Sequence, residues 1–163
     1  MIQLEKYRDP WIAQGVNDQI GFYNREFFCL DNFSSFKILY QGHLFSSVEE
    51  AYQAIGFIDT APEVAEAIIN SKSALEAKEI AHSHIDERRS DWDDVKLALM
   101  ESICRAKLEQ HPYVQKKLLQ TGDYSIVEDS PTDSFWGCGY DRTGRNEMGK
   151  IWMRLRAQLQ AKL

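Results

Sequence analysis

The pattern of apolar and polar positions changes near residue 45, and it predicts short strands before this point and helices after it. The first 45 residues mix aromatic and β-branched residues with polar ones, which is typical of short extended segments. We expect these segments at residues 20–23, 27–30, 36–40 and 43–45. Gln41 and Gly42 separate the last two segments, and such a pair is typical of a hairpin turn.

Three helices are predicted from residue 47 onward, because a serine or threonine followed by glutamate three positions later is typical of a helix start. The pairs are Ser47 with Glu50, Thr60 with Glu63, and Ser73 with Glu76. We expect these helices to end near Ile58, Asn70 and His84.

A longer helix is predicted from Asp91 to about Gln110. It carries apolar residues at helical spacing, namely Trp92, Val95, Leu99 and Ile103. A shorter helix to about Leu119 and a last one from about Asn146 follow. The last helix carries Met148, Ile151, Trp152, Leu155 and Leu159 on one face. The pattern as a whole predicts an α+β fold, predominantly α-helical with short N-terminal strands, in a single domain spanning residues 1–163.

Composition and charge exclude several functional classes. Of 163 residues, 44% are hydrophobic and 27% charged, which is typical of a soluble globular protein. No apolar run approaches the roughly 20 residues of a membrane helix, and the N-terminus lacks the apolar core of a signal peptide. We therefore expect a cytoplasmic protein with no membrane partner. A net charge of −6 also argues against a duplex-DNA scaffold role.

The C-terminal part is locally basic, with six basic and three acidic residues from Asp133 onward. This is compatible with a small phosphorylated ligand, and equally with a solvated helix face. The cysteines, Cys29, Cys104 and Cys138, are far apart and odd in number, so they predict neither a disulfide framework nor a metal site. We expect no metal and no cofactor.

The segment from residue 120 to 149 is the first candidate site, because long loops in compact domains are often functional. It combines carboxylates, the aromatic pair Phe135-Trp136, and glycines that include Gly137, Gly139, Gly144 and Gly149. Glycines allow close backbone approach to a ligand, and an exposed tryptophan can stack on a base. Asn146 would begin a helix whose free N–H groups suit a phosphate, with Arg142, Arg145 and Lys150 nearby. Alternatively, the aromatic pair fills the core and the carboxylates are solvated.

Two further candidates lie at helix starts. Glu49, in the helix beginning at Ser47, is a candidate catalytic carboxylate, although glutamates in a first helical turn are more often capping residues. Arg89 and Trp92 lie at the start of the long helix, where the alternative is an ordinary helix start with a core tryptophan.

Taken in order, several motifs resemble the NADAR family (NAD- and ADP-ribose-associated, also called YbiA-like). They include Asp31-Asn32-Phe33-Ser34, Ser47-Val48-Glu49 with Tyr52-Gln53-Ala54, Arg89 with Asp91-Trp92, Thr121-Gly122-Asp123, Asp133-Ser134-Phe135-Trp136-Gly137, and Gly144 through Asn146 to Gly149. The resemblance covers about residues 20–158. Spacing of D-x-F/Y-W-G followed by G-x-N-x-x-G is specific to this family.

The resemblance implies an N-glycosidase that cleaves the C–N bond between a heterocyclic base and a ribose bearing phosphate. The implied substrates are ADP-ribosylated guanine or a phosphoribosylamino-pyrimidine of riboflavin synthesis. By the same resemblance, Glu49 activates the attacking group or stabilises the cationic sugar, and Asp133 orients the ribose or assists proton transfer. The residues that would bind substrate are Asn32, Phe33, Arg89, Trp92, Gly122, Asp123, Trp136, Gly137 and Asn146.

One position departs from the family pattern. The family has a lysine seven residues after the glutamate, where this chain has Gly56. A lysine there can attack the sugar through a Schiff base or hold phosphate, and glycine can do neither. Three explanations are open: water attacks directly with Glu49 as base; the vacated space admits another substrate or another lysine; or catalysis is lost and the domain only binds ADP-ribose or a nucleotide. Besides an enzyme and a binding module, a structural, partner-binding helical protein is the third functional class compatible with the sequence.

Overall fold

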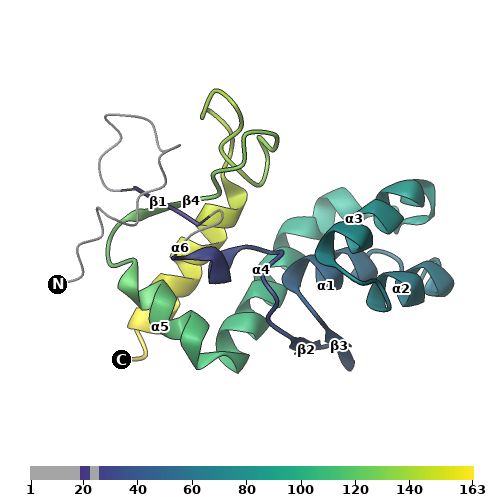
Figure 1. Ribbon diagram of the computed structural model, residues 1–163, viewed down its shortest axis with the longest axis horizontal. Coiled ribbons are helices and arrows are strands. Elements are labelled where there is room, and N and C mark those ends of the chain that lie inside the picture. The colour runs from purple at the N-terminus through teal and green to yellow at the C-terminus, as the bar shows by residue number, and fades with distance from the viewer. Residues whose placement is uncertain (1–18, 23–25) are drawn as a thin grey trace. The chain divides into compact units, whose positions relative to one another are not determined.

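The computed structural model describes residues 19–22 and 26–163 (Figure 1). Helices dominate these residues, and each strand is three residues long, so the predicted α+β, mainly helical class is confirmed. The chain divides into two compact units. The central unit is Asn32–Gln110, and the terminal unit combines the described residues up to Asp31 with His111–Leu163. The assignment of residues 1–163 to one domain stays a prediction. No helix in the described part of the chain is long and apolar enough to cross a membrane.

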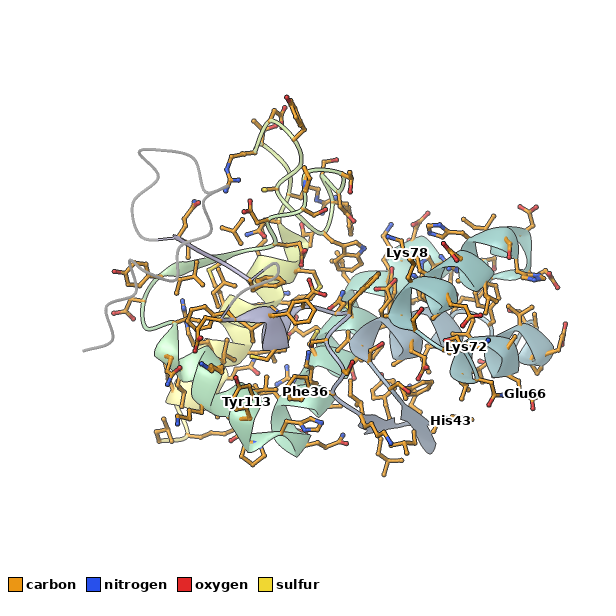
Figure 2. The ribbon with its side chains drawn as sticks, viewed as in Figure 1. Phe36, His43, Glu66, Lys72, Lys78 and Tyr113 are labelled. Carbon is orange, nitrogen blue, oxygen red and sulfur yellow. The ribbon has the colours of Figure 1, made fainter. Side chains whose placement is uncertain are left out.

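A β-hairpin begins the central unit. Strands β2 (Ile38–Tyr40) and β3 (His43–Phe45) pair antiparallel. The turn residues Gln41 and Gly42 have φ angles of 48° and 81°, so the predicted hairpin turn is confirmed. The side chain of His43 lies on this hairpin (Figure 2).

Four helices follow in the central unit: α1 (Val48–Ile55), α2 (Pro62–Ile69), α3 (Ala74–Ser83) and α4 (Trp92–Gln110), with a short 3₁₀ helix η3 (Ile85–Glu87) before α4. Ser47 and Ser73 cap α1 and α3 as predicted, each hydroxyl accepting a backbone N–H at 3.1 Å. The predicted cap Thr60 is wrong. Ala61 precedes α2 instead, because Pro62 occupies the first helical position with its φ already helical.

The predicted apolar face of α4 is only half right. Trp92 and Ile103 are buried, whereas Val95 and Leu99 are half-buried. The buried side is instead completed by Met100, Cys104, Lys107 and Leu108. Lys107 is fully buried; its Nζ donates to Ser34 Oγ at 2.7 Å and lies 5.1 Å from the centre of the Phe36 ring. A pattern of apolar residues does not include a lysine, so the burial of Lys107 was not predicted.

The terminal unit contains two strands and two longer helices. Strand β1 (Gln19–Gly21) pairs in parallel with β4 (Ser125–Val127). The helices are α5 (Pro112–Gln120) and α6 (Glu147–Gln160), both close to their predicted bounds. Trp152 of α6 is fully buried, and its Nε1 donates to the Leu30 carbonyl at 2.9 Å.

Of the strands predicted in this unit, one is wrong and one is confirmed in part. Residues 27–30 do not form a strand but the 3₁₀ helix η2 (Phe28–Leu30), in which the Leu30 N–H donates to the Phe27 carbonyl at 2.9 Å. The predicted strand at 20–23 is confirmed through Gly21 as part of β1, and residue 23 lies outside the described residues. Strand β4 was not expected, because it is short and flanked by polar residues.

Candidate active site

Glu49 lies in the first turn of α1 and is buried, with 6% of its surface exposed. Its backbone N–H donates to the Asn32 carbonyl at 3.0 Å, which ties the segment before β2 to the start of α1. Its Oε1 accepts a hydrogen bond from Gln53 Nε2 at 2.7 Å, one helical turn further on. The positive end of the helix favours an ionised carboxylate at this position.

The capping role belongs to the neighbouring glutamate. Glu50 Oε2 accepts the Ser46 N–H at 2.5 Å, and the Glu50 N–H donates to Ser47 Oγ. Burial raises the pKa of Glu50, and the hydrogen bonds from Ser46 oppose this. The ordinary explanation for a glutamate in a first turn therefore applies to Glu50, and it does not account for the buried carboxylate of Glu49.

Aromatic and cationic groups lie beside Glu49 in the same unit. The Tyr52 and Trp92 rings are 4.8 Å apart between centroids, and the Arg88 guanidinium carbon lies 4.8 Å from the Trp92 ring centre. Burial, and after it the negative charge of Glu49, raises the pKa of Tyr52 far above its ordinary value. Tyr52 is therefore a neutral hydroxyl at physiological pH, next to a carboxylate.

Arg89, Asn32 and Phe33 belong to the same central unit. Arg89 forms a bidentate pair with Asp91, with N–O distances of 2.6 and 2.8 Å, and the pair is partly exposed. Asn32 Nδ2 contacts Met100 Sδ at 3.7 Å, and Phe33 is 37% exposed. The central unit thus brings together five of the predicted residues: Asn32, Phe33, Glu49, Arg89 and Trp92.

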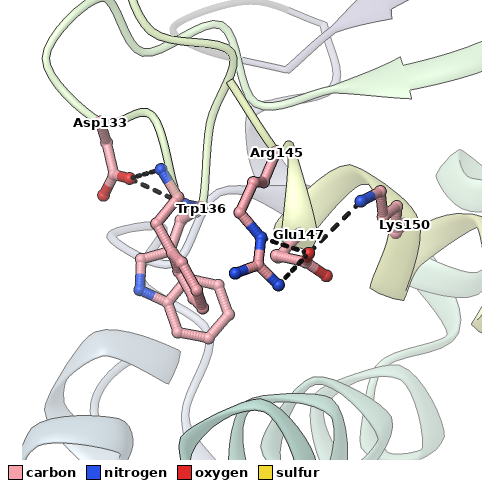
Figure 3. Close-up of polar contacts among 6 residues, drawn as sticks. Asp133, Trp136, Arg145, Glu147 and Lys150 are labelled. Atoms are coloured by element: carbon pink, nitrogen blue, oxygen red, sulfur yellow. Dashed lines mark hydrogen bonds and ion pairs between the residues drawn. The ribbon is translucent and has the colours of Figure 1, made fainter. Parts of the chain in front are cut away.

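The other predicted residues lie in the terminal unit, where Asp133 organises a tight loop. Its Oδ1 accepts the backbone N–H groups of Phe135 at 2.9 Å and Trp136 at 2.7 Å (Figure 3). The Phe135 and Trp136 rings meet edge to face, with centroids 4.9 Å apart, and both side chains are half-buried. The alternative in which this pair fills the core is not supported.

The glycines of this loop serve internal packing more than ligand approach. A Cβ on Gly137 would lie 2.8 Å from the Glu128 carbonyl oxygen and 2.9 Å from that of Asp133, so only glycine fits. Gly122 differs, since it has a φ of +54° and open space around it, and the next residue, Asp123, is exposed. The expectation that these glycines approach a ligand is retained only for Gly122.

The start of α6 is not a free anion site. The N–H groups of Glu147 and Met148 donate to the Phe135 and Trp136 carbonyls, both at 3.1 Å. The Asn146 amide is also engaged at both ends: Nδ2 donates to the Ile126 carbonyl and Oδ1 accepts the Glu128 N–H, both at 2.9 Å. The expectation of free N–H groups here is therefore wrong.

The basic residues near α6 are ion-paired. Glu147 contacts Arg145 at 3.0 Å and Lys150 at 3.3 Å (Figure 3). Burial opposes ionisation of Glu147, but these hydrogen bonds prevail and lower its pKa. Arg142 pairs with Asp129 at 2.6 Å. Three of the six basic residues of the C-terminal part are thus ion-paired, two of them with the single carboxylate of Glu147.

No group of three or more His, Cys, Asp or Glu side chains that could hold a metal ion occurs in residues 19–22 and 26–163.

Comparison with known proteins decides the family. The sequence model of the NADAR domain matches residues 21–160. The chain belongs to the NADAR family. An N-glycosidase of Nostoc punctiforme is 35% identical over 133 residues, covering 81% of this chain and 85% of that protein. The N-glycosidase YbiA of Escherichia coli is 31% identical over 142 residues, covering 86% and 88%.

A longer relative and a solved structure extend the comparison. A riboflavin biosynthesis protein of Vibrio vulnificus is 36% identical over 131 residues, which are 80% of this chain and 35% of that protein. The NMR structure of the Escherichia coli protein YbiA resembles this fold with a TM-score of 0.80 and 29% identity, covering 94% of this chain and 95% of the other. The YbiA-like fold and the NADAR resemblance are confirmed.

The sequence placed Gln53 on the candidate helix with Glu49 but did not predict its role as a hydrogen-bond donor to Glu49, and Arg88 was not predicted as a site residue. Gln53 follows Glu49 by four positions, which is the spacing of neighbours on a helix face, so its contact was foreseeable. Arg88 lies before α4, outside any periodic pattern, and gives no such signal.

Proposed function

We propose that this protein is an N-glycosidase that hydrolyses the C–N bond between a heterocyclic base and a phosphate-bearing ribose, either phosphoribose or ADP-ribose. Family membership and the names of the relatives support the N-glycosidase class. The observation that carries the proposal is the buried carboxylate of Glu49, held by Gln53 and not used to cap α1. The candidate substrates are ADP-ribosylated guanine and a phosphoribosylamino-pyrimidine.

In this mechanism Glu49 stabilises the positive charge that develops on the ribose as the C–N bond breaks. The bonding pair goes to the base nitrogen, which takes up a proton. A water molecule adds to the anomeric carbon and loses a proton to Glu49. Gly56 offers no amine at the position of the family lysine, so in this proposal the attacking group is water.

The other predicted residues would bind and orient the substrate. Trp92 of the central unit would stack against the base, which is typically worth about 1–3 kcal/mol per base. Asp133, besides shaping its loop, would orient the ribose or assist protonation of the leaving base. Asn32, Phe33 and Arg89, which belong to the same unit as Trp92, would shape the pocket and hold the ribose or phosphate. The proposed partner is a small phosphorylated nucleoside-like ligand or an ADP-ribosylated guanine base. We propose no membrane partner, no duplex-DNA scaffold role, and a cytoplasmic location.

The second candidate function is a non-catalytic ADP-ribose or nucleotide-binding module. Gly56 favours it, because this position offers neither an amine nor a charge for chemistry on the sugar. Glu49 favours the enzyme, because a preplaced buried carboxylate stabilises the positive charge that cleavage builds on the sugar, whereas in a binding module it would only accept hydrogen bonds from ribose hydroxyls.

Mass-spectrometric detection of released base tests the proposal. ADP-ribosylated guanine in single-stranded DNA and the phosphoribosylamino-pyrimidine are offered separately, each with borohydride present or absent. Release of base from either, with no borohydride-trapped adduct on the protein, is the expected result. A trapped adduct would refute attack by water. No release from either substrate, with ADP-ribose binding retained in calorimetry, would refute the enzyme and favour the binding module.

A further inference from the structure

Gly56 has no conformational reason to be glycine. It caps the end of α1 with φ −65° and ψ −16°, which any residue adopts. What is unusual is the space beside it. A Cβ at this position would lie 3.2 Å from Arg88 Cγ, 3.3 Å from Arg88 Nε and 3.3 Å from the Gln53 carbonyl oxygen. The Arg88 side chain therefore passes directly over Gly56, at a distance that a methyl group would disturb.

The guanidinium of Arg88 is fixed by three neighbours. Its carbon lies 5.1 Å from the Phe57 ring centre and 4.8 Å from that of Trp92, so both rings contact the cation. Its Nη2 donates to Gln53 Oε1 at 2.7 Å. Burial lowers the pKa of Arg88, and negative charge on neighbours that include Glu49 opposes this. Arg88 and Glu49 are therefore within electrostatic reach of each other.

The Gln53 amide connects the two charges. Its oxygen accepts from Arg88, and its Nε2 donates to Glu49 Oε1 at 2.7 Å. A guanidinium has only donors, so the amide must turn its oxygen toward Arg88. That orientation necessarily points the NH₂ group at Glu49. Without Arg88, the amide loses the contact that selects this orientation.

We propose that Arg88 is a positioning residue, which holds the Glu49 carboxylate for reaction through Gln53, and that Gly56 is the residue that gives Arg88 room. This inference rests on the proposed function, in which Glu49 acts on the ribose. This inference also gives Gly56 a role, because the absence of a side chain at this position accommodates Arg88. Arg88 acts through Glu49 and does not attack the sugar itself.

Steady-state kinetics of Arg88 variants test the positioning role, using whichever of the two substrates above is cleaved. R88M keeps an unbranched chain between the two rings and removes every donor. We expect its kcat to fall about 10- to 100-fold, as small misplacements of a reacting group do, with KM within about threefold. R88K retains the charge and one donor, and it should recover part of the lost kcat. The matched control is R105M, which removes an arginine paired with Glu101 elsewhere in the central unit and should leave kcat unchanged.

A double-mutant cycle tests the role of Gly56. G56A should lower kcat several-fold in the parent chain, because Arg88 must shift by a few tenths of an ångström. In the R88A background, where no long side chain passes over this position, G56A should have no further effect. Independent effects of the two substitutions would overturn the claim that Gly56 makes room for Arg88.

The remaining outcomes separate this inference from the proposed function. If the parent chain cleaves and R88M cleaves equally fast, the positioning role is wrong and the N-glycosidase stands. If R88M raises KM and leaves kcat unchanged, Arg88 binds substrate directly and the positioning role is again wrong. A parent chain that cleaves neither substrate overturns the proposed function itself. In every case circular dichroism and the Tm of each variant confirm that it is folded.

Discussion

Replacing Glu49 with glutamine separates its charge from its place in the fold. Glutamine has the same shape, and its oxygen can still accept the hydrogen bond from Gln53 Nε2, now 2.7 Å from the carboxylate. Exchanging a charged for a neutral acceptor costs about 1 kcal/mol of unfolding free energy, or about 2–4 °C in Tm for a chain of this size. The rate should suffer far more. Loss of a carboxylate acting as base lowers kcat about 10²- to 10⁴-fold, which corresponds to about 3–5 kcal/mol.

The neighbouring glutamate provides the matched control. E50Q changes the same side chain in the same helical turn, but Glu50 hydrogen-bonds the Ser46 N–H and caps α1. We expect E49Q to lose cleavage while it binds ADP-ribose within about tenfold of the parent, and E50Q to keep kcat. Release of base is followed by mass spectrometry and binding by calorimetry. Equal rates for E49Q and the parent would refute the catalytic assignment. Equal losses in both variants would show that only the start of α1 matters.

Three further predictions concern stability, each measured by thermal or urea unfolding. N146G removes both side-chain hydrogen bonds and should destabilise the protein by about 1–3 kcal/mol. N146A should cost about 1 kcal/mol more, because residue 146 has a φ of 51°, which glycine adopts more easily than alanine. Equal losses in the two variants would show that this left-handed backbone conformation carries no strain for alanine. G149A should cost about 3 kcal/mol, since its Cβ would lie 2.1 Å from the Ile126 carbonyl oxygen; an unchanged Tm would show that the backbone yields. Burial raises the pKa of Glu50 above its ordinary value of 4.5, so protonated Glu50 stabilises the fold and this contribution is lost as the pH rises through the raised pKa. E50Q should therefore gain stability relative to the parent as the pH rises above 4.5, and a constant difference would argue against the shift.

The helices were predictable because their signals are local. Ser47 and Ser73 cap through contacts three residues away, and Pro112 begins α5 where its fixed φ allows. Strand β4 was missed because its stabilising partner, β1, lies about a hundred residues earlier in the chain. A three-residue strand carries too little pattern of its own to reveal such a pairing.

The loop before α6 shows the same limit for the candidate site. Its sequence correctly indicated an unusual structure, but the glycines and Asn146 turn inward to satisfy the loop's own backbone groups. Composition alone cannot distinguish a glycine that approaches a ligand from one that approaches a carbonyl. The same holds for Arg145 and Lys150, which both pair with Glu147, itself a residue of the same short segment.

Pairs of identical neighbours show why residue type and spacing alone do not assign a role. Glu49 and Glu50 are adjacent, and so are Arg88 and Arg89, yet within each pair the side chains do different work. One glutamate caps the helix while the other meets Gln53, because successive helical residues point about 100° apart. One arginine pairs with a partly exposed aspartate while the other reaches the Gln53 amide. Residue type and spacing locate such pairs, and only the direction of each side chain decides which member can act on a substrate.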